Sequence, residues 1–376
     1  MKDNKIKILK SFQDTDFSSL RLRRDFEINS LNYLIDSGYV NIDTPVIESA
    51  DLFFRKSLGS TSGNTYTFTD PQNQQVSLRP DFTASIMRYA FSNLKKIENG
   101  AGKYCYSGPV FRFENNDESY NQIYQIGAEY ISERKHGYEP EVVLDAIKCL
   151  EINKVKEFKI NLGNVGIVRK YLDKLGLNNS LVEFFLTNLK LLNLKNYEDE
   201  LLSKAKFQNL IKSNKKSDNL SKDEIKEKFS IELESNLGSR SHDEVVDRYF
   251  NKISSQVIES EFNESILKLK ELLNINLENI NINSFESELN FEDFEKLIDS
   301  LLDFGIQKDN ICIDFSLTRN LAYYDGVVFD LIYKNELIGG GGKYDDLPKM
   351  LGYKSDYSCF GFAINISKFM DALNNE

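Results

Sequence analysis

Residues 316–346 decide the fold, and they read SLTRNLAYYDGVVFDLIYKNELIGGGGKYDD. The apolar, β-branched run at 326–333 predicts a buried strand, and a short turn and four consecutive glycines follow it. Such a strand can place Arg319, Tyr323 and Tyr324 beside a floor of glycine. Because glycine lets a backbone approach a ligand closely and arginine pairs with anions, this arrangement predicts a pocket for a small polar molecule. The alternative is a loop or barrel corner whose tyrosines belong to the core.

The composition is that of a folded protein with 376 residues and a net charge of −11. This length allows one large domain with an insertion, or two to three ordinary domains. The acidic balance argues against wholesale nucleic-acid binding, which needs clustered lysine and arginine. Four scattered cysteines and two histidines make a zinc site or a disulfide framework improbable, so we expect no metal.

No apolar run approaches the roughly 20 residues that span a bilayer, and the N-terminus has no continuous apolar segment typical of a secretory signal. We therefore expect a cytoplasmic protein without a membrane partner.

The first half of the chain alternates helix and strand signals. Residues 19–38 predict a helix that ends at a glycine, and residues 39–49 predict a strand whose Pro45 favours an edge or interface position. A hairpin signal joins 65–69 to 75–78, and Pro80 is expected to open a helix over 81–94.

Further along, two β-rich segments flank a polar loop at 115–119, and a helix, a strand and a turn follow it. These elements are predicted at 103–114, 122–132, 140–153, 157–162 and 163–166. From residue 178 to about 272 the pattern is helical and rich in lysine and glutamate, which indicates a helical insertion. The predicted domains are a core in two parts, 1–175 and 273–376, and an insertion at 176–272.

Four motifs occur together with the opening stretch. They are SLRPDFT at 77–83, GPVFRFE at 108–114, NQIYQIGAE at 121–129 and CFGFAINI at 359–366. In this order they resemble the catalytic core of class II histidyl-tRNA synthetases. The resemblance implies an α+β fold with an antiparallel sheet flanked by helices, and a homodimer formed through a proline-containing first motif at 44–48.

The resemblance also implies a histidine pocket made of Asp81, Phe82, Thr83, Arg112, Gln125, Glu129, Arg319, Tyr323 and Tyr324. Asp81 would face the ammonium group and Arg319 the carboxylate, while Gln125 and Glu129 would approach the imidazole and amino groups. Arg112 matches the second-motif arginine that touches ATP and the carboxylate. A zwitterion that carries an imidazole needs such a set of partners. The alternative is that Glu129 and Arg319 form a structural ion pair.

Departures from the family pattern concern ATP. Lys368 stands where the third motif has an arginine that grips the triphosphate, and lysine lacks the planar fork of arginine. The loop 115–119 holds two acids and no base. Losing one such contact commonly costs ~3 kcal/mol, or ~10²-fold in rate. We therefore expect weak adenylate formation, no catalytic residues and no cofactor.

The sequence stops at Glu376, where a synthetase would continue into an anticodon-binding domain, so we expect no such domain and no tRNA partner. A synthetase-like core that keeps the histidine pocket but lacks the ATP contacts and the anticodon-binding domain resembles the regulatory subunit of ATP phosphoribosyltransferase. Residues 238–248 are also similar to sequences of that family. The implied partner is the short catalytic subunit in a larger hetero-oligomer, with L-histidine as ligand. Two alternatives remain open. One is enzymatic: a divergent or truncated histidine–tRNA ligase, or a stand-alone aminoacyl transferase that acts on something other than tRNA. The other is a dimeric scaffold with a vestigial pocket.

Overall fold

The structure is a computed structural model. It describes residues 6–56, 65–93, 101–113, 120–133, 137–212, 256–279, 289–317, 323–353 and 356–374. Arg319, the loop 115–119 and the segment 238–248 lie outside the described residues. The chain forms two compact units, and the second, residues 168–275, is inserted between the two parts of the first, residues 1–167 and 276–376.

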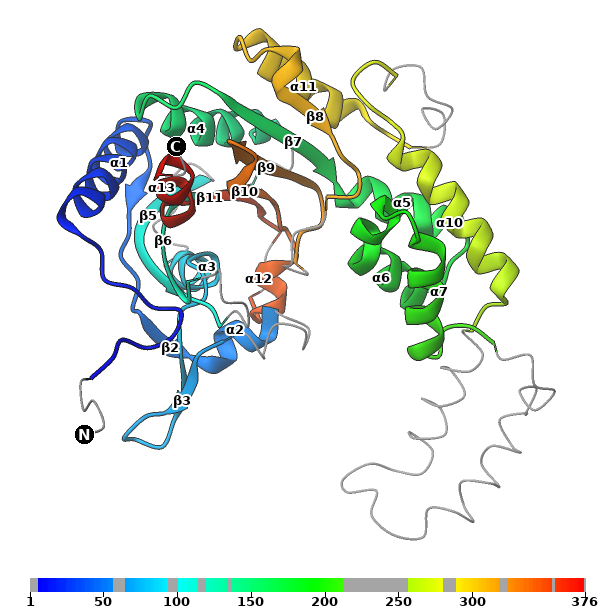
Figure 1. Cartoon of the computed structure of the whole chain (residues 1–376), viewed down its shortest axis with the longest axis horizontal. Coiled ribbons are helices and arrows are strands. Elements are labelled where there is room, and N and C mark those ends of the chain that lie inside the picture. The colour runs from blue at the N-terminus through cyan, green and yellow to red at the C-terminus, as the bar shows by residue number, and fades with distance from the viewer. Residues whose placement is uncertain are drawn as a thin grey trace, which may run out of the picture. The chain divides into compact units, whose positions relative to one another are not determined.

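An eight-stranded sheet is the framework of the first unit (Figure 1). Its strand order is β1 (Val40–Asn41), β5 (Ala101–Phe111), β6 (Gln122–Ser132), β11 (Ser358–Asn365), β10 (Glu336–Lys343), β9 (Val327–Tyr333), β7 (Phe158–Asn164) and β8 (Ile311–Ile313). The predicted α+β class is confirmed. The sheet is mixed, because β1 pairs with β5, and β7 with β8, in parallel, whereas the central pairs are antiparallel.

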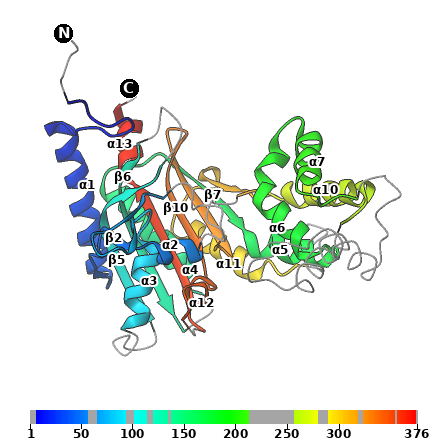
Figure 2. The same ribbon diagram turned by 90° about the horizontal axis from the view of Figure 1, so that it is seen from below.

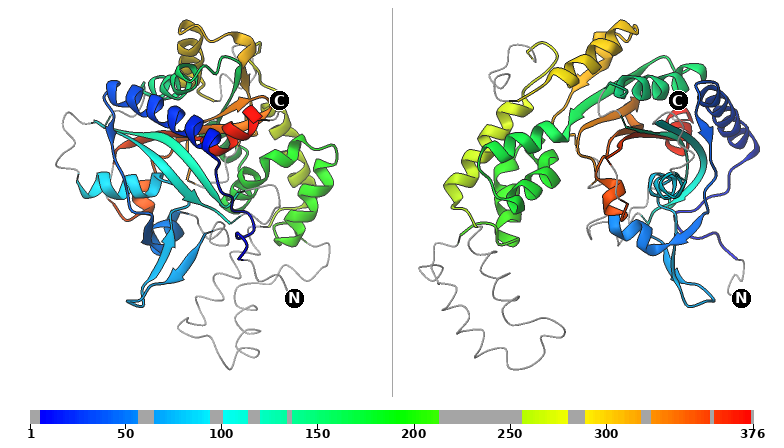
Figure 3. Two further views of the ribbon diagram at one scale, coloured as in Figure 1. Left: turned by 60° about the vertical axis from the view of Figure 1, so that its left-hand side comes forward. Right: turned by 180° about the vertical axis from the view of Figure 1, so that it is seen from behind.

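Helices cover both faces of this sheet. One face is packed by α1 (Phe17–Asp36), α4 (Glu139–Ile152) and α13 (Ile366–Asn374), and α1 and α13 lie side by side in Figure 2. The long strands β5 and β6 run next to α1, as the left view of Figure 3 shows. The other face packs against α3 (Thr83–Ser92). The other helices in the described residues of this unit are α2 (Ala50–Lys56), α11 (Glu292–Asp303), η6 (Lys308–Asn310) and α12 (Leu347–Met350).

A three-stranded sheet of β2 (Ile47–Ser49), β4 (Gln75–Leu78) and β3 (Thr67–Thr69) confirms the predicted hairpin. The predicted single strand over 39–49 is wrong, because that stretch is divided between β1 and β2 in two different sheets. Pro45 has no N–H to continue a ladder. In addition, the main-chain N–H of Arg79 donates to the Val46 carbonyl and holds the chain in its new direction.

The predicted turn at 163–166 is also wrong, since β7 continues to Asn164 and α5 (Val165–Lys174) begins at once. The second unit contains α6 (Asn179–Asn188), η4 (Leu189–Asn193), α7 (Tyr197–Phe207) and α10 (Glu259–Leu273). Its core includes the packed rings of Phe184, Phe185 and Phe262. No helix in the described part of the chain is both long and apolar enough to cross a membrane.

Candidate ligand-binding site

The candidate site lies at the centre of the large sheet, where glycines in β10 and β11 leave the surface of the sheet free of side chains. Gly361 of β11 lies between Glu129 of β6 and Gly342 of β10 in the strand register, so these three residues share one face. A Cβ atom on Gly361 would lie 1.7 Å from Oε2 of Glu129. The predicted glycine floor is therefore part of strand β10 and its neighbour, where missing side chains leave room for Glu129.

Glu129 lies on this face with only 1 % of its surface exposed, and its carboxyl group accepts three hydrogen bonds. Its Oε1 accepts hydrogen bonds from the Thr83 hydroxyl at 2.7 Å and the Tyr106 hydroxyl at 3.2 Å. Its Oε2 accepts one from the Tyr344 hydroxyl. Three hydroxyl groups from α3, β5 and the end of β10 thus fix one carboxyl group, which is how a buried acid is kept in place.

Burial raises the pKa of Glu129 to about 7, because the carboxylate loses hydration. The three hydroxyl donors favour the ionised form and oppose this rise, while the nearby charge of Asp81 adds to it. Two buried acids in one site favour a ligand that brings a positive charge or N–H donors.

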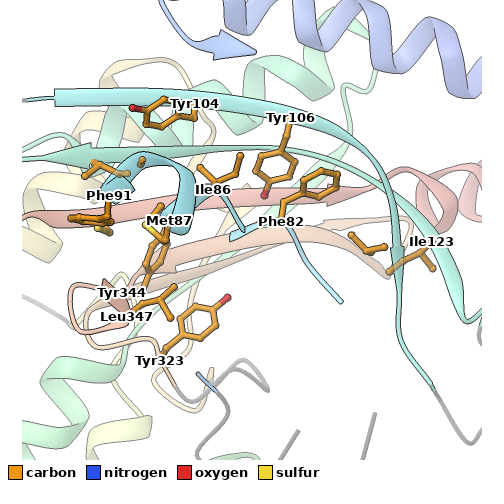
Figure 4. Packing of buried hydrophobic residues seen from close by; sticks show 14 residues of the cluster. Phe82, Ile86, Met87, Phe91, Tyr104, Tyr106, Ile123, Tyr323, Tyr344 and Leu347 are labelled. Carbon is orange, nitrogen blue, oxygen red and sulfur yellow. The ribbon is translucent and has the colours of Figure 1, made fainter. Parts of the chain in front are cut away.

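The two predicted tyrosines lie with this acidic pair. The rings of Tyr323 and Tyr324 are 4.9 Å apart, and Tyr323 meets the ring of Tyr344 edge-on at 5.7 Å. Burial raises the pKa of Tyr323 well above its usual value, and the charges of Asp81 and Glu129 add to the rise. Tyr323 is therefore a neutral hydroxyl donor beside two acids. Figure 4 shows Tyr323 and Tyr344 in the same buried cluster as Phe82 and Tyr106.

Gln125 and Arg112 complete the predicted set within the described residues. Gln125 is two strand repeats from Glu129, hence on the same face, and it is only 6 % exposed. Its Oε1 is buried without a hydrogen-bond partner among the described residues, which makes it an acceptor for a donor from a ligand. Arg112 donates from Nε to the Pro80 carbonyl at 2.7 Å. Because Pro80 directly precedes Asp81 in the sequence, this hydrogen bond brings Arg112 close to Asp81.

The ring of Phe82 is packed between two other side chains. One face of its ring is covered by the Arg79 guanidinium, 3.9 Å from the ring centre. The other face stacks on Tyr106 with the ring centres 4.3 Å apart. Both faces of the Phe82 ring are therefore occupied, and the ring holds Tyr106, a partner of Glu129, from one side.

Sequence reasoning missed Tyr106, Tyr344 and Arg79. Tyr106 pairs with Gly127, so strand alternation from Glu129 could have placed it on the same face. Tyr344 stands two residues beyond Gly342 and could have been found in the same way. Arg79 carried no signal, because a fully buried arginine is unusual and its partners are main-chain carbonyls.

Two lysines, Lys343 and Lys368, lie away from the acidic pair. Lys343 is next to Gly342 and so faces the opposite side of β10, where Nζ lies 3.1 Å from Oε1 of Glu139. Lys368 is exposed on α13, and its main-chain N–H donates to Oδ1 of Asn365. Among the described residues, no three histidine, cysteine, aspartate or glutamate side chains gather in a way that could hold a metal ion.

Comparisons with known proteins agree with this architecture. A histidine–tRNA ligase of Sulfolobus acidocaldarius is 27% identical over 376 residues, which cover 96% of this chain and 76% of the relative. The histidine–tRNA ligase of Methanococcus vannielii is also 27% identical, over 93% of this chain and 72% of its own length.

Two solved structures share the fold. A histidine–tRNA ligase subunit from Alicyclobacillus acidocaldarius has a TM-score of 0.65 at 21% identity and covers 99% of this chain and 98% of its own. A protein from Bacillus halodurans, described as an ATP phosphoribosyltransferase regulatory subunit/histidyl-tRNA synthetase, has a TM-score of 0.67 at 20% identity, with 100% and 85% covered. The profile of the family described as Histidyl-tRNA synthetase matches residues 11–369, and the chain belongs to that family.

Proposed function

We propose that this member of the histidyl-tRNA synthetase family is a non-catalytic regulatory subunit of ATP phosphoribosyltransferase. It would act in the cytoplasm, bind L-histidine in the site around Glu129, and transmit histidine binding to a short catalytic subunit. The first step of histidine biosynthesis would thereby come under feedback control.

The contrast between the amino-acid site and the expected ATP contact carries this proposal. The acids, hydroxyls and tyrosines that suit histidine converge on one buried face. Lys368, in contrast, replaces the arginine expected to hold the triphosphate, and it is exposed. Lysine offers a point charge in place of a bidentate fork. The Bacillus halodurans protein, which shares the fold, is described both as such a regulatory subunit and as a histidyl-tRNA synthetase, so the fold is compatible with the proposed role.

Histidine binding is tested by isothermal titration calorimetry, first on this chain and then on its complex with the catalytic subunit. We expect binding to the chain alone and inhibition of the complex. A coupling free energy of ~1–3 kcal/mol between histidine and the catalytic subunit would change the histidine affinity about 5- to 150-fold between the chain alone and the complex. Glu129→Ala should abolish both effects, whereas Glu157→Ala, at an exposed glutamate of the same unit, should change neither. Inhibition that persists in Glu129→Ala would contradict sensing at this site.

A second candidate is a divergent histidine–tRNA ligase. It is favoured by the curated relatives, which bear that name and match more than nine tenths of this chain. Arg112, the expected second-motif arginine, is also retained beside Asp81.

An ATP–pyrophosphate exchange assay with histidine separates the two candidates. We expect exchange at or near the background of a no-enzyme control, because one lost phosphate contact costs ~10²-fold in rate. Lys368→Arg tests whether the missing arginine causes the low rate, because restoring the planar guanidinium should raise the rate of exchange. Robust exchange by the natural sequence would overturn the regulatory proposal.

A further inference from the structure

Arg79 is the largest fully buried side chain in the described part of the protein, with 2 % exposure. Its ionic contact with Asp43 is loose, at 3.7 Å, and Asp43 is 91% exposed. The closer partners are main-chain carbonyls: Nη1 donates to Thr44 at 2.6 Å and Nε donates to Pro109 at 2.9 Å. Because a buried charge is costly without a close counter-ion, this placement needs a reason beyond filling space.

The guanidinium is the first member of a continuous stack that ends at the acid of the site. It lies 3.9 Å above the Phe82 ring centre, and Phe82 stacks on Tyr106 with 15° between the ring planes. The Tyr106 hydroxyl lies 3.2 Å from Oε1 of Glu129 and 3.3 Å from the Phe362 carbonyl. A displacement of the guanidinium therefore reaches Glu129 through two rigid rings.

The backbone leaves space for this arrangement. A Cβ atom on Gly108 would lie 2.7 Å from Nη2 of Arg79 and 3.2 Å from the Phe82 ring. Glycine at 108 is thus required for the guanidinium to reach its stacking position.

We propose that Arg79 is a positioning residue for the carboxyl group of Glu129 and acts through the stacked rings of Phe82 and Tyr106. The expected effect on histidine affinity rests on the proposed function. The effect on the Glu129 carboxyl group does not, because its titration can be measured without a ligand. Arg79 also joins the site to the segment 43–46, since Thr44 and Val46 accept its side-chain and main-chain hydrogen bonds.

The test follows the titration of Glu129 by ¹³C NMR of the glutamate carboxyl carbons in the full chain, with Glu129→Gln to assign the signal. Arg79→Lys keeps the positive charge and removes the planar stack. We expect it to raise the pKa of Glu129 by about half a unit or more, because a misplaced Tyr106 hydroxyl no longer favours the carboxylate. Gly108→Ala displaces the guanidinium without changing its chemistry, so it should shift the titration in the same direction. It replaces Arg79→Lys as the test variant if that protein does not fold.

Two comparisons distinguish positioning from a general loss of structure. In a Tyr106→Phe background, Arg79→Lys should produce no further shift, because the connecting hydroxyl is already absent. Arg88→Lys is the matched control, since Arg88 lies in the same segment and binds Glu48 at 2.6 Å; it should leave the titration unchanged. An unshifted titration in Arg79→Lys and Gly108→Ala, or equal shifts with and without Tyr106, would overturn the inference.

Histidine calorimetry on the same variants provides the functional readout. Arg79→Lys should weaken binding about tenfold, equivalent to ~1.4 kcal/mol, with Arg88→Lys close to the natural protein. If the natural protein binds no histidine, the proposed function fails, while the titration data still decide the role of Arg79.

Discussion

Glu129 shows how one residue acquires its properties from its surroundings. Its carboxyl group is buried among Thr83, Tyr106 and Tyr344, all of which can donate hydrogen bonds to it. Desolvation nevertheless dominates and raises its pKa to about 7. A carboxyl group that titrates near neutrality can change charge with small changes in its environment, which suits a residue that responds to a cationic ligand.

The stability of the protein should carry the signature of this titration. The folded pKa of about 7 exceeds the usual glutamate value of 4.5, so the folded state holds more protons between these values and stability falls as pH rises through that window. Ionising Glu129 should cost about 3 kcal/mol above pH 7. Urea unfolding from pH 4.5 to 7.5 should show a smaller decline for Glu129→Gln than for the natural protein. The exposed control Glu157→Gln should follow the natural protein, and parallel curves for all three proteins would refute the assignment.

At the scale of elements, the central strands create the site by pairing glycine against bulky groups. Gly341 pairs with Phe362, and a Cβ atom on it would lie 1.9 Å from the Gly361 carbonyl. At Gly127 a Cβ would lie 2.2 Å from the Phe362 carbonyl. The strands β6, β11 and β10 can keep their spacing only because these positions lack side chains.

Gly361→Ala should therefore disturb both the sheet and the site. Its Cβ would clash with the Glu129 carboxyl group and lie 2.7 Å from the Ala128 carbonyl, so strand separation or displacement of Glu129 must follow. We expect a loss of about 1–3 kcal/mol in the free energy of unfolding together with loss of histidine binding. Gly339→Ala is the control, because its Cβ would lie 2.8 Å from the Ala363 carbonyl in the same strand pair but on the face opposite to Glu129; it should lose stability and keep its histidine affinity. Normal histidine affinity in Gly361→Ala would show that the carboxyl group is not held as described.

At the scale of the whole molecule, the short strand β2 offers an edge for assembly. It lies at the end of the three-stranded sheet, and Ile47 and the preceding Val46 are 50% and 37% exposed. An edge strand with apolar side chains tends to pair with another chain. This segment coincides with the proline-containing motif through which we propose a homodimer.

Ile47→Asp should shift the protein from dimer to monomer, because a buried charge at a symmetric interface is introduced twice. Sedimentation velocity over a range of concentrations measures the change. Phe207→Asp, at a residue that is 88% exposed in the second unit, should leave the mass unaltered. An unchanged dimer in Ile47→Asp would place the interface elsewhere.

By itself, the sequence determined the hairpin, the long strands β5 and β6, and the motifs whose order identifies the family, because these depend on local periodicity and turn chemistry. Only the tertiary structure decided that residues 39–49 are divided between two sheets, that Arg79 and Tyr106 pack on the Phe82 ring, and that Tyr106 and Tyr344 hold Glu129. Tyr344 and Glu129 are 215 positions apart, and the register of the antiparallel strands joins them. Alternation shows which residues share a face of one strand, but the contacts between strands depend on register, which no single segment encodes.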